Sequence, residues 1–181
     1  SNESQTVLHM IFEQVSSHQV LILDGGAISL FAASQIDLPE ALLVFTPHQK
    51  EWEKLSGLDL ASQTEDKSRR AVQNFPQGTV IVEKGPHTRI WTSGQEEGYQ
   101  LDVGGPYQAT GGMGDTLAGM ISGFVGQFPQ VSLYERVVVA TYLHSAIAED
   151  LSKEAYVVLP TTISQEIPKW MKKAVKVHIS S

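Results

Sequence analysis

The chain has 181 residues, a formal net charge of −7 and no cysteine. This length suits a single domain, and the lack of cysteine excludes disulfides and thiolate metal sites. The sequence has no stretch of about 18 apolar residues, which excludes a membrane-spanning helix. Nucleic acid is not expected as a partner, because the net charge is acidic and no basic stripe is present. The start, "SNESQTVLHM", lacks a secretory signal, so we expect a soluble cytoplasmic protein.

The first half of the chain alternates between predicted helices and strands. Residues 5–17 have helical spacing, with Val7, Leu8, Ile11, Phe12 and Val15 on one predicted face. A buried strand, "QVLILDGG", a short helix, "AISLFAAS", and a second strand, "ALLVFTPH", follow.

The helix after the second strand carries start and stop signals, and it runs through "HQKEWEKLSG" to Gly57. Thr46 is predicted to cap it, with Gln49 completing a capping box and Pro47 at the first helical position.

The rest of the chain is predicted to contain three more strands and then mostly helix. A polar helix near 64–74 leads to the strand "TVIVEKG", and "TRIWTS" and "GYQLDVG" form a strand pair. Helices are predicted at about 115–127, 132–151 and 162–176. Strand–helix alternation of this kind predicts an α/β layered fold. Since the strands end in charged residues or glycine, we expect a ligand crevice at their carboxyl edge.

The stretch "TGGMGD", from Thr110 to Asp115, directly precedes an apolar helix pattern. Glycines allow close backbone approach, and the unpaired N–H groups of a helix start attract anions. The turn is therefore a candidate phosphate cradle. Asp115 has two interpretations from the residues alone: it caps the helix, or it accepts a proton from a hydroxyl that attacks a phosphoryl group.

Several other residues have both a functional and a structural interpretation. Asp24 ends a buried strand, where a carboxylate favours a functional role. Lys84 is equally compatible with an ordinary strand end and with a nucleotide contact, and His48 by residue type alone favours an exposed first-turn position. His144 lies in an apolar helix pattern and is interpreted as a core histidine. The three tryptophans are interpreted as packing residues: Trp52, Trp91 and Trp170.

Four ordered motifs between residues 20 and 127 resemble one family. The segment "TGGMGDTLAGMISGFVGQ" is similar to the ribokinase-like signature, and "LVFTPHQKEWEKLSG", "VIVEKGPHTRI" and "LILDGGAISLF" resemble segments of the ADP/ATP-dependent NAD(P)H-hydrate dehydratases. The resemblance implies a ribokinase-like three-layer αβα fold with a mainly parallel sheet. It also implies a repair enzyme that dehydrates hydrated NAD(P)H at the expense of ADP or ATP, with Mg²⁺ on the phosphates and no dedicated metal ligands in this sequence.

The resemblance also implies residue roles. Asp115 would be the catalytic base and contact the substrate, with the amides of Gly111, Gly112 and Gly114 stabilising the transferred phosphoryl group. His48 and Asp24 would contact the hydrated cofactor. The adenine nucleotide would be held by the following residues: Lys84, Gly85, Pro86, His87, Thr88, Gly111 and Gly114.

Two features depart from the family pattern. Only one predicted helix precedes the "LILDGG" strand, so we expect 1–181 to be a single but incomplete domain that lacks the N-terminal part. We also expect a homo-oligomer, and one alternative is that a separate N-terminal piece completes the domain. Gly26 stands where many relatives carry a second acidic residue.

Two other functions remain open from the sequence. One is a ribokinase-like kinase that phosphorylates a hydroxymethyl group with the same Asp115, and the other is a nucleotide-binding subunit without catalysis. The choices between ADP and ATP and between NADH and NADPH hydrate also remain open.

Overall fold

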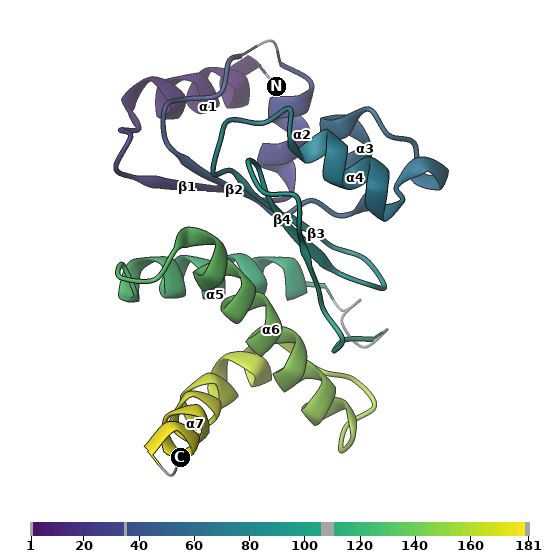
Figure 1. Ribbon diagram of the computed structural model, residues 1–181, viewed down its shortest axis with the longest axis vertical. Helices are drawn as coiled ribbons and strands as arrows, with labels where there is room; N and C mark the ends of the chain where they lie inside the picture. The colour runs from purple at the N-terminus through teal and green to yellow at the C-terminus, as the bar shows by residue number, and fades with distance from the viewer. Residues whose placement is uncertain (1, 35, 106–110, 180–181) are drawn as a thin grey trace. The chain divides into compact units, whose positions relative to one another are not determined.

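The computed structural model describes residues 2–34, 36–105 and 111–179 (Figure 1). The chain divides into two compact units, Ser1–Gln100 and Leu101–Ser181. Thr110, the first residue of the glycine-rich motif, lies outside the described residues.

The first unit contains a mixed five-stranded sheet in the order β1-β2-β3-β4-β5. The pairs β1–β2 and β2–β3 are parallel, and the pairs β3–β4 and β4–β5 are antiparallel. The strands are β1 (Val20–Leu23), β2 (Leu42–Phe45), β3 (Val80–Glu83), β4 (Arg89–Thr92) and β5 (Tyr99–Gln100). The predicted α/β class is therefore confirmed. Strands β1, β2 and β3 are parallel, and β4 and β5 extend the sheet by antiparallel pairing.

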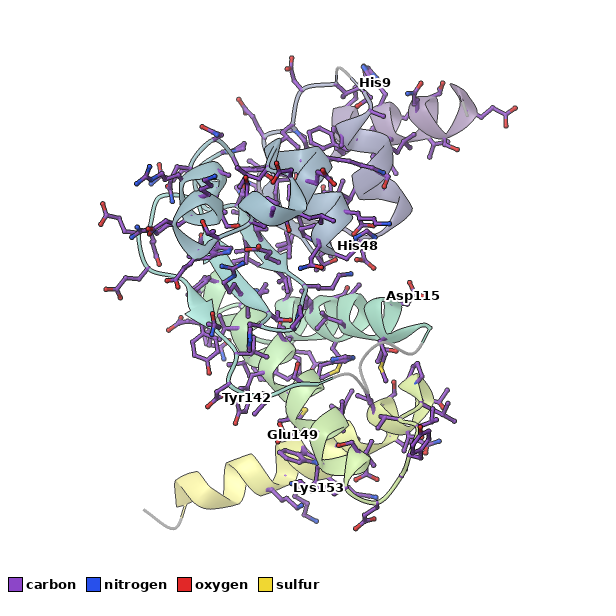
Figure 2. The ribbon with its side chains drawn as sticks, turned by 90° about the vertical axis from the view of Figure 1, so that its right-hand side faces the viewer. His9, His48, Asp115, Tyr142, Glu149 and Lys153 are labelled. Atoms are coloured by element: carbon purple, nitrogen blue, oxygen red, sulfur yellow. The ribbon has the colours of Figure 1, made fainter. Side chains whose placement is uncertain are left out.

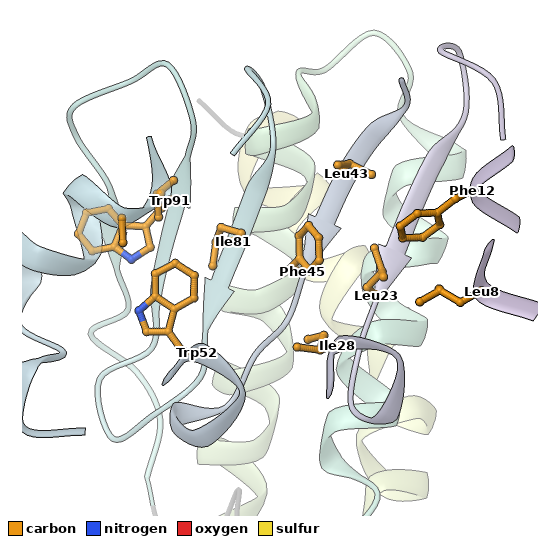
Figure 3. Packing of buried hydrophobic residues seen from close by; sticks show 11 residues of the cluster. Leu8, Phe12, Leu23, Ile28, Leu43, Phe45, Trp52, Ile81 and Trp91 are labelled. Atoms are coloured by element: carbon orange, nitrogen blue, oxygen red, sulfur yellow. The ribbon is translucent and has the colours of Figure 1, made fainter. Parts of the chain in front are cut away.

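Helices follow each of the first two strands, as the alternating sequence pattern predicts. The helices of this unit are α1 (Asn2–Gln14), α2 (Gly26–Ala32), α3 (Gln49–Ser56) and α4 (Glu65–Val72), with the 3₁₀ turn η1 (Leu60–Ser62) between α3 and α4. Their buried side chains meet alternate residues of the strands in one core (Figure 3), as the two-residue period of a strand requires. That core includes Phe12, Ile28, Leu43, Phe45, Trp52, Ile81 and Trp91.

Helix α1 differs in detail from the prediction. It ends at Gln14, so Val15 lies outside it. Leu8 and Phe12 are buried, but Val7 and Ile11 remain 55% and 44% exposed. The helical period was correct, whereas the apolar face is narrower than the pattern predicted.

The second unit contains three helices within its described residues: α5 (Met113–Gln127), α6 (Leu133–Ser152) and α7 (Pro160–Ile179). Ser132 and Glu135 form a capping box at the start of α6. The three helices enclose a core to which each contributes: Met113, Met120, Ile147, Ala148 and Ile163, joined by Val158. His144 is buried, as predicted for a core histidine, and Trp170 packs against this core. No helix in the described ranges has the length and apolarity for crossing a bilayer.

Candidate functional site

The carboxyl ends of the three parallel strands bring polar side chains together. Asp24 directly follows β1, Thr46 follows β2 and Lys84 follows β3. One oxygen of Asp24, Oδ1, accepts hydrogen bonds from Thr46 Oγ1 at 2.5 Å and from Lys84 Nζ at 2.9 Å. The strand ends that the sequence predicted to form a ligand edge therefore meet in one hydrogen-bonded cluster.

Asp24 is held in its ionised form by this cluster. Burial by itself raises the pKa of the carboxyl group, but the hydrogen bonds from Thr46 and Lys84 and the positive charge of Lys84 outweigh it. The pKa of Asp24 consequently lies below its ordinary value. The side chains of Lys84 and Asp24 are 22% and 17% exposed, so the pair can still be reached from solvent.

Thr46 does not cap α3, contrary to the sequence prediction. It is fully buried, its N–H donates to Leu23 O at 3.1 Å, and its hydroxyl is used by Asp24. Pro47 is not the first helical residue either, since its carbonyl accepts from Lys84 N–H at 2.8 Å in an extension of the parallel pairing. The chain thus stays extended for two residues beyond β2.

His48 is the N-cap of α3. Its Nδ1 accepts from the N–H groups of Lys50 and Glu51, at 3.1 and 3.2 Å, and Glu51 Oε2 accepts from His48 N–H at 2.8 Å. This reciprocal pair forms the capping box that the sequence assigned to Thr46 and Gln49. Because Nδ1 is an acceptor here, the proton of the neutral ring lies on Nε2. The side chain of His48 is 55% exposed, and its Nε2 lies 3.4 Å from Glu51 Oε1.

The candidate nucleotide segment forms the turn between β3 and β4. Gly85, Pro86 and His87 are exposed, and Thr88 Oγ1 donates to Gly85 O at 3.3 Å across the turn. The backbone pairing of Lys84 with Pro47 places this turn beside His48. The structure therefore brings together all the candidate residues of the first unit.

Behind this turn lies a buried polar network that sequence reasoning missed. Glu83 is 4% exposed, and its carboxylate accepts from Ser68 Oγ and Arg89 Nη2 on one oxygen and from Trp91 Nε1 on the other. Trp52 Nε1 in turn donates to Ser68 Oγ at 3.0 Å. The charged end of "TVIVEKG" was the available signal for this network in the sequence. The partners of Glu83, however, come from α4 and β4.

The glycine-rich turn forms the start of α5 in the second unit. Gly112 is the N-cap, with φ +87°, and its carbonyl accepts from the N–H and the hydroxyl of Thr116, both at 3.0 Å. The N–H groups of the three residues before Thr116 have no acceptor inside the helix. A positive φ is a conformation that glycine adopts without strain. The helix-start amides without an acceptor inside the helix are therefore those of Met113, Gly114 and Asp115, whereas the prediction named Gly111, Gly112 and Gly114.

Asp115 is not the helix cap. It is the third residue of α5, because the helix begins at Met113, two residues earlier than predicted, and it is exposed (Figure 2). Its carboxylate has no hydrogen-bond or ion-pair partner among the described residues of its own unit. The capping interpretation is therefore wrong for this residue. A carboxylate in the first turn is favoured by the helix dipole, and this one remains available to a ligand.

The candidate residues form one group in each unit. The strand-edge group consists of Asp24, His48 and residues 84–88, and the helix-start group consists of Gly111, Gly112, Gly114 and Asp115. In the described part of the chain, no three His, Asp or Glu side chains are arranged to hold a metal ion.

Comparisons with known proteins match both units. The model of the NAD(P)H-hydrate dehydratase family matches residues 2–169. The chain is 60% identical over 168 residues to the ADP-dependent (S)-NAD(P)H-hydrate dehydratase of Streptococcus pneumoniae, covering 93% of this chain and 58% of the relative. It thus spans less than two thirds of that protein.

Solved structures give the same result. A ribokinase-like superfamily protein of Enterococcus faecalis matches with a TM-score of 0.87 and 44% identity, covering 96% of this chain and 59% of the other. The ADP/ATP-dependent NAD(P)H-hydrate dehydratase of Bacillus subtilis, co-crystallised with ATP and Mg²⁺, matches with a TM-score of 0.76 and 27% identity, covering 96% and 60%. The chain belongs to the NAD(P)H-hydrate dehydratase family.

Proposed function

We propose that the chain carries the catalytic base and the nucleotide-binding residues of an enzyme that removes water from hydrated NAD(P)H. One structural observation carries the proposal: the exposed carboxylate of Asp115, with no partner among the described residues of its unit, stands in the first turn of a helix whose first amides have no acceptor inside the helix. An anion cradle beside a free base suits transfer of a phosphoryl group to a hydroxyl. The relative in Streptococcus pneumoniae bears the name of this activity.

The chemistry assigned to these residues proceeds in two stages. Asp115 accepts the proton of the ring hydroxyl as the hydroxyl oxygen attacks the terminal phosphoryl group of the nucleotide, while the open amides stabilise charge on the phosphoryl oxygens. Phosphate then leaves with the electrons of the carbon–oxygen bond, pushed by the lone pair of the ring nitrogen. Loss of a proton from the neighbouring ring carbon restores the double bond, so the overall reaction is that of a carbon–oxygen lyase.

The other candidate residues are assigned to binding. We assign contact with the hydrated cofactor to His48, contact with the adenine nucleotide to residues 84–88, and contact with phosphoryl oxygens to Gly111 and Gly114. A Mg²⁺ ion prefers phosphate and water oxygens as ligands. The described residues offer no carboxylate cage, so such an ion would be held by the nucleotide, and it would neutralise phosphate charge.

We further propose ADP as the phosphoryl donor, because relatives at 60% and 44% identity are named ADP-dependent dehydratases. These names also favour dehydration over phosphorylation of a hydroxymethyl group. Since both substrates are metabolites of the cell interior, we propose a cytoplasmic enzyme, and we retain the prediction that it forms a homo-oligomer.

The test supplies hydrated NADH to the protein in its longest natural form, with ADP, with ATP or without nucleotide. We expect the absorbance of reduced nicotinamide to recover only with nucleotide, and faster with ADP. The Asp115→Asn variant serves as the matched control. It should still bind nucleotide, and the absorbance should not recover. Recovery without nucleotide, or undiminished recovery in that variant, would contradict the proposal.

A further inference from the structure

The ammonium group of Lys84 is only partly used by the protein. A lysine ammonium has three N–H donors, and in the described residues of the first unit Lys84 Nζ contacts one acceptor, Asp24 Oδ1 at 2.9 Å. The remaining donors are available to a ligand, because the side chain is still 22% exposed. The backbone of Lys84 is also fixed, through its N–H bond to Pro47 O.

The neighbouring ion pair shows what a purely structural pair looks like in the same unit. Glu83 and Arg89 are 4% and 16% exposed, and the carboxylate has three donors from α4 and β4. Asp24 and Lys84 lack this enclosure. They stand at the open end of the strands, next to the exposed turn 84–88.

Charge explains why these two residues occur together. An isolated carboxylate at this edge would repel the phosphates of a nucleotide, whereas a carboxylate paired with lysine adds no net charge. A lysine alone is a mobile point charge on a flexible stem. Asp24 restricts that stem to one position, and the Thr46 hydroxyl, bonded to the same Oδ1 at 2.5 Å, fixes the orientation of the carboxylate.

We propose that Asp24 is a positioning residue: with Thr46 it holds the ammonium group of Lys84 where it meets the phosphates of the adenine nucleotide. This inference rests on the proposed function. It gives Asp24 a role toward the nucleotide, in place of the direct contact with hydrated NAD(P)H that the family resemblance implied. Lys84 touches the ligand, and Asp24 acts through Lys84.

The first experiment measures binding to the 181-residue chain, by calorimetry, with ADP and with adenosine as the two probes. The variant Asp24→Asn should weaken ADP binding about tenfold, equivalent to about 1.4 kcal/mol, and should leave adenosine binding unchanged because adenosine has no phosphate. The matched control is Asp66→Asn, which also removes one negative charge and breaks an ion pair, with Arg69 at 2.7 Å. It should leave the affinity for both probes unchanged.

A double-variant cycle tests whether Asp24 acts through Lys84. Lys84→Met should weaken ADP binding at least as much as Asp24→Asn, and the double variant should be no weaker than Lys84→Met alone. Additive losses would overturn the proposal. If Asp24→Asn does not fold, Thr46→Val and Thr46→Ser replace it, and we expect loss of ADP affinity with valine and recovery with serine.

Turnover by the longest natural form separates this inference from the proposed function. The expected result is a raised KM for ADP in Asp24→Asn with an unchanged KM for hydrated NADH. A raised KM for the hydrate alone would make Asp24 a substrate contact and overturn the positioning role while the dehydratase stands. Phosphate-selective binding without any dehydratase activity would support the positioning role and reject the proposed function.

Discussion

Glu83 and Arg89 face each other as the last residue pair joining β3 to β4, and their side chains form an ion pair at 2.9 Å. Ser68 and Trp91 complete the bonding of the same carboxylate. This closed network supports the base of the turn that carries the candidate nucleotide residues. It also illustrates how one strand end serves two purposes, since Glu83 is buried and the next residue, Lys84, remains accessible.

Replacing Glu83 by Gln should destabilise the protein by about 3 kcal/mol, because removing one partner leaves a buried charge uncompensated. Urea unfolding followed by circular dichroism measures this. The exposed pair of Asp66 and Arg69 provides the comparison, and Asp66→Asn should change the free energy of unfolding by less than about 1 kcal/mol. If Glu83→Gln lowered the free energy of unfolding by less than about 1 kcal/mol as well, the network would add little to stability.

Asp24 should make stability depend on pH in the acid range. Its folded-state pKa is lowered by Thr46 and Lys84, so it stabilises the fold above the unfolded aspartate pKa of about 3.9. This stabilisation is lost as the pH falls through the folded-state value. We expect wild type to be more stable than Asp24→Asn at neutral pH and the difference to shrink below about pH 4. Denaturant unfolding at a series of pH values checks it, and a constant difference would contradict it.

The variant Asp115→Asn should bind nucleotide normally and lose turnover by a factor of about 10² to 10⁴, the range for a general base. The free energy of unfolding should change by no more than about 0.5 kcal/mol, because the side chain is exposed. Nucleotide titration and the absorbance assay separate the two effects. Joint loss of binding and turnover would instead make Asp115 a nucleotide ligand.

The conformation of Gly112 should be required at the start of α5. Its φ is +87°, and an added Cβ would lie 3.3 Å from Pro160 Cγ. We expect Gly112→Ala to destabilise the protein by about 1–2 kcal/mol and to weaken ADP binding. Gly119→Ala in the same helix is the control, since an added Cβ there meets nothing within 4 Å. It should stabilise by about 0.5–1 kcal/mol, and equal effects of the two variants would contradict the argument.

His48 has a structural and a proposed binding role that two variants can separate. Asn is among the best N-cap residues, so His48→Asn should keep the stability of α3, whereas His48→Ala should lose about 1 kcal/mol. Both variants should raise the KM for hydrated NADH, because both remove the imidazole. Thermal unfolding and the absorbance assay report the two roles. If only His48→Ala changed the KM, His48 would serve the helix alone.

The sequence predicted the kind and order of the elements in both units. Parallel strands are buried and read as apolar runs, such as "LLVF" in β2, and these runs end where a charged or polar residue appears. The start of α5 was predicted for a similar reason, because the positive φ of Gly112 favours glycine. Local patterns therefore located Asp24, Lys84, Gly112 and Asp115 as candidates.

Helix starts were less predictable. In the segment "TPHQKE" the residue types favoured Thr46 as the cap and put His48 inside the first turn. The structure uses His48 because Thr46 is buried and its hydroxyl is bonded to Asp24, which directly follows β1 and lies 22 residues earlier in the chain. The Thr46 hydroxyl could bond either to the helix start or to a residue far away in the sequence. The fold decides between these partners, because it brings Asp24 within hydrogen-bond distance.

By itself, the sequence determined the α/β class, the strand ends that carry polar residues and the glycine before α5, since these depend on period, burial and backbone freedom within a few residues. Only the tertiary structure determined that Asp24 holds Lys84, that Glu83 is enclosed by Ser68, Arg89 and Trp91, and that His48 caps α3. The cap by His48 is local, and it follows from the bond of Thr46 to Asp24. The contacts of Asp24 and Glu83 link different strands and helices, and a hydrogen bond requires its two atoms to lie within about 3 Å. Such proximity arises when the strands pair, in a register that no local pattern contains.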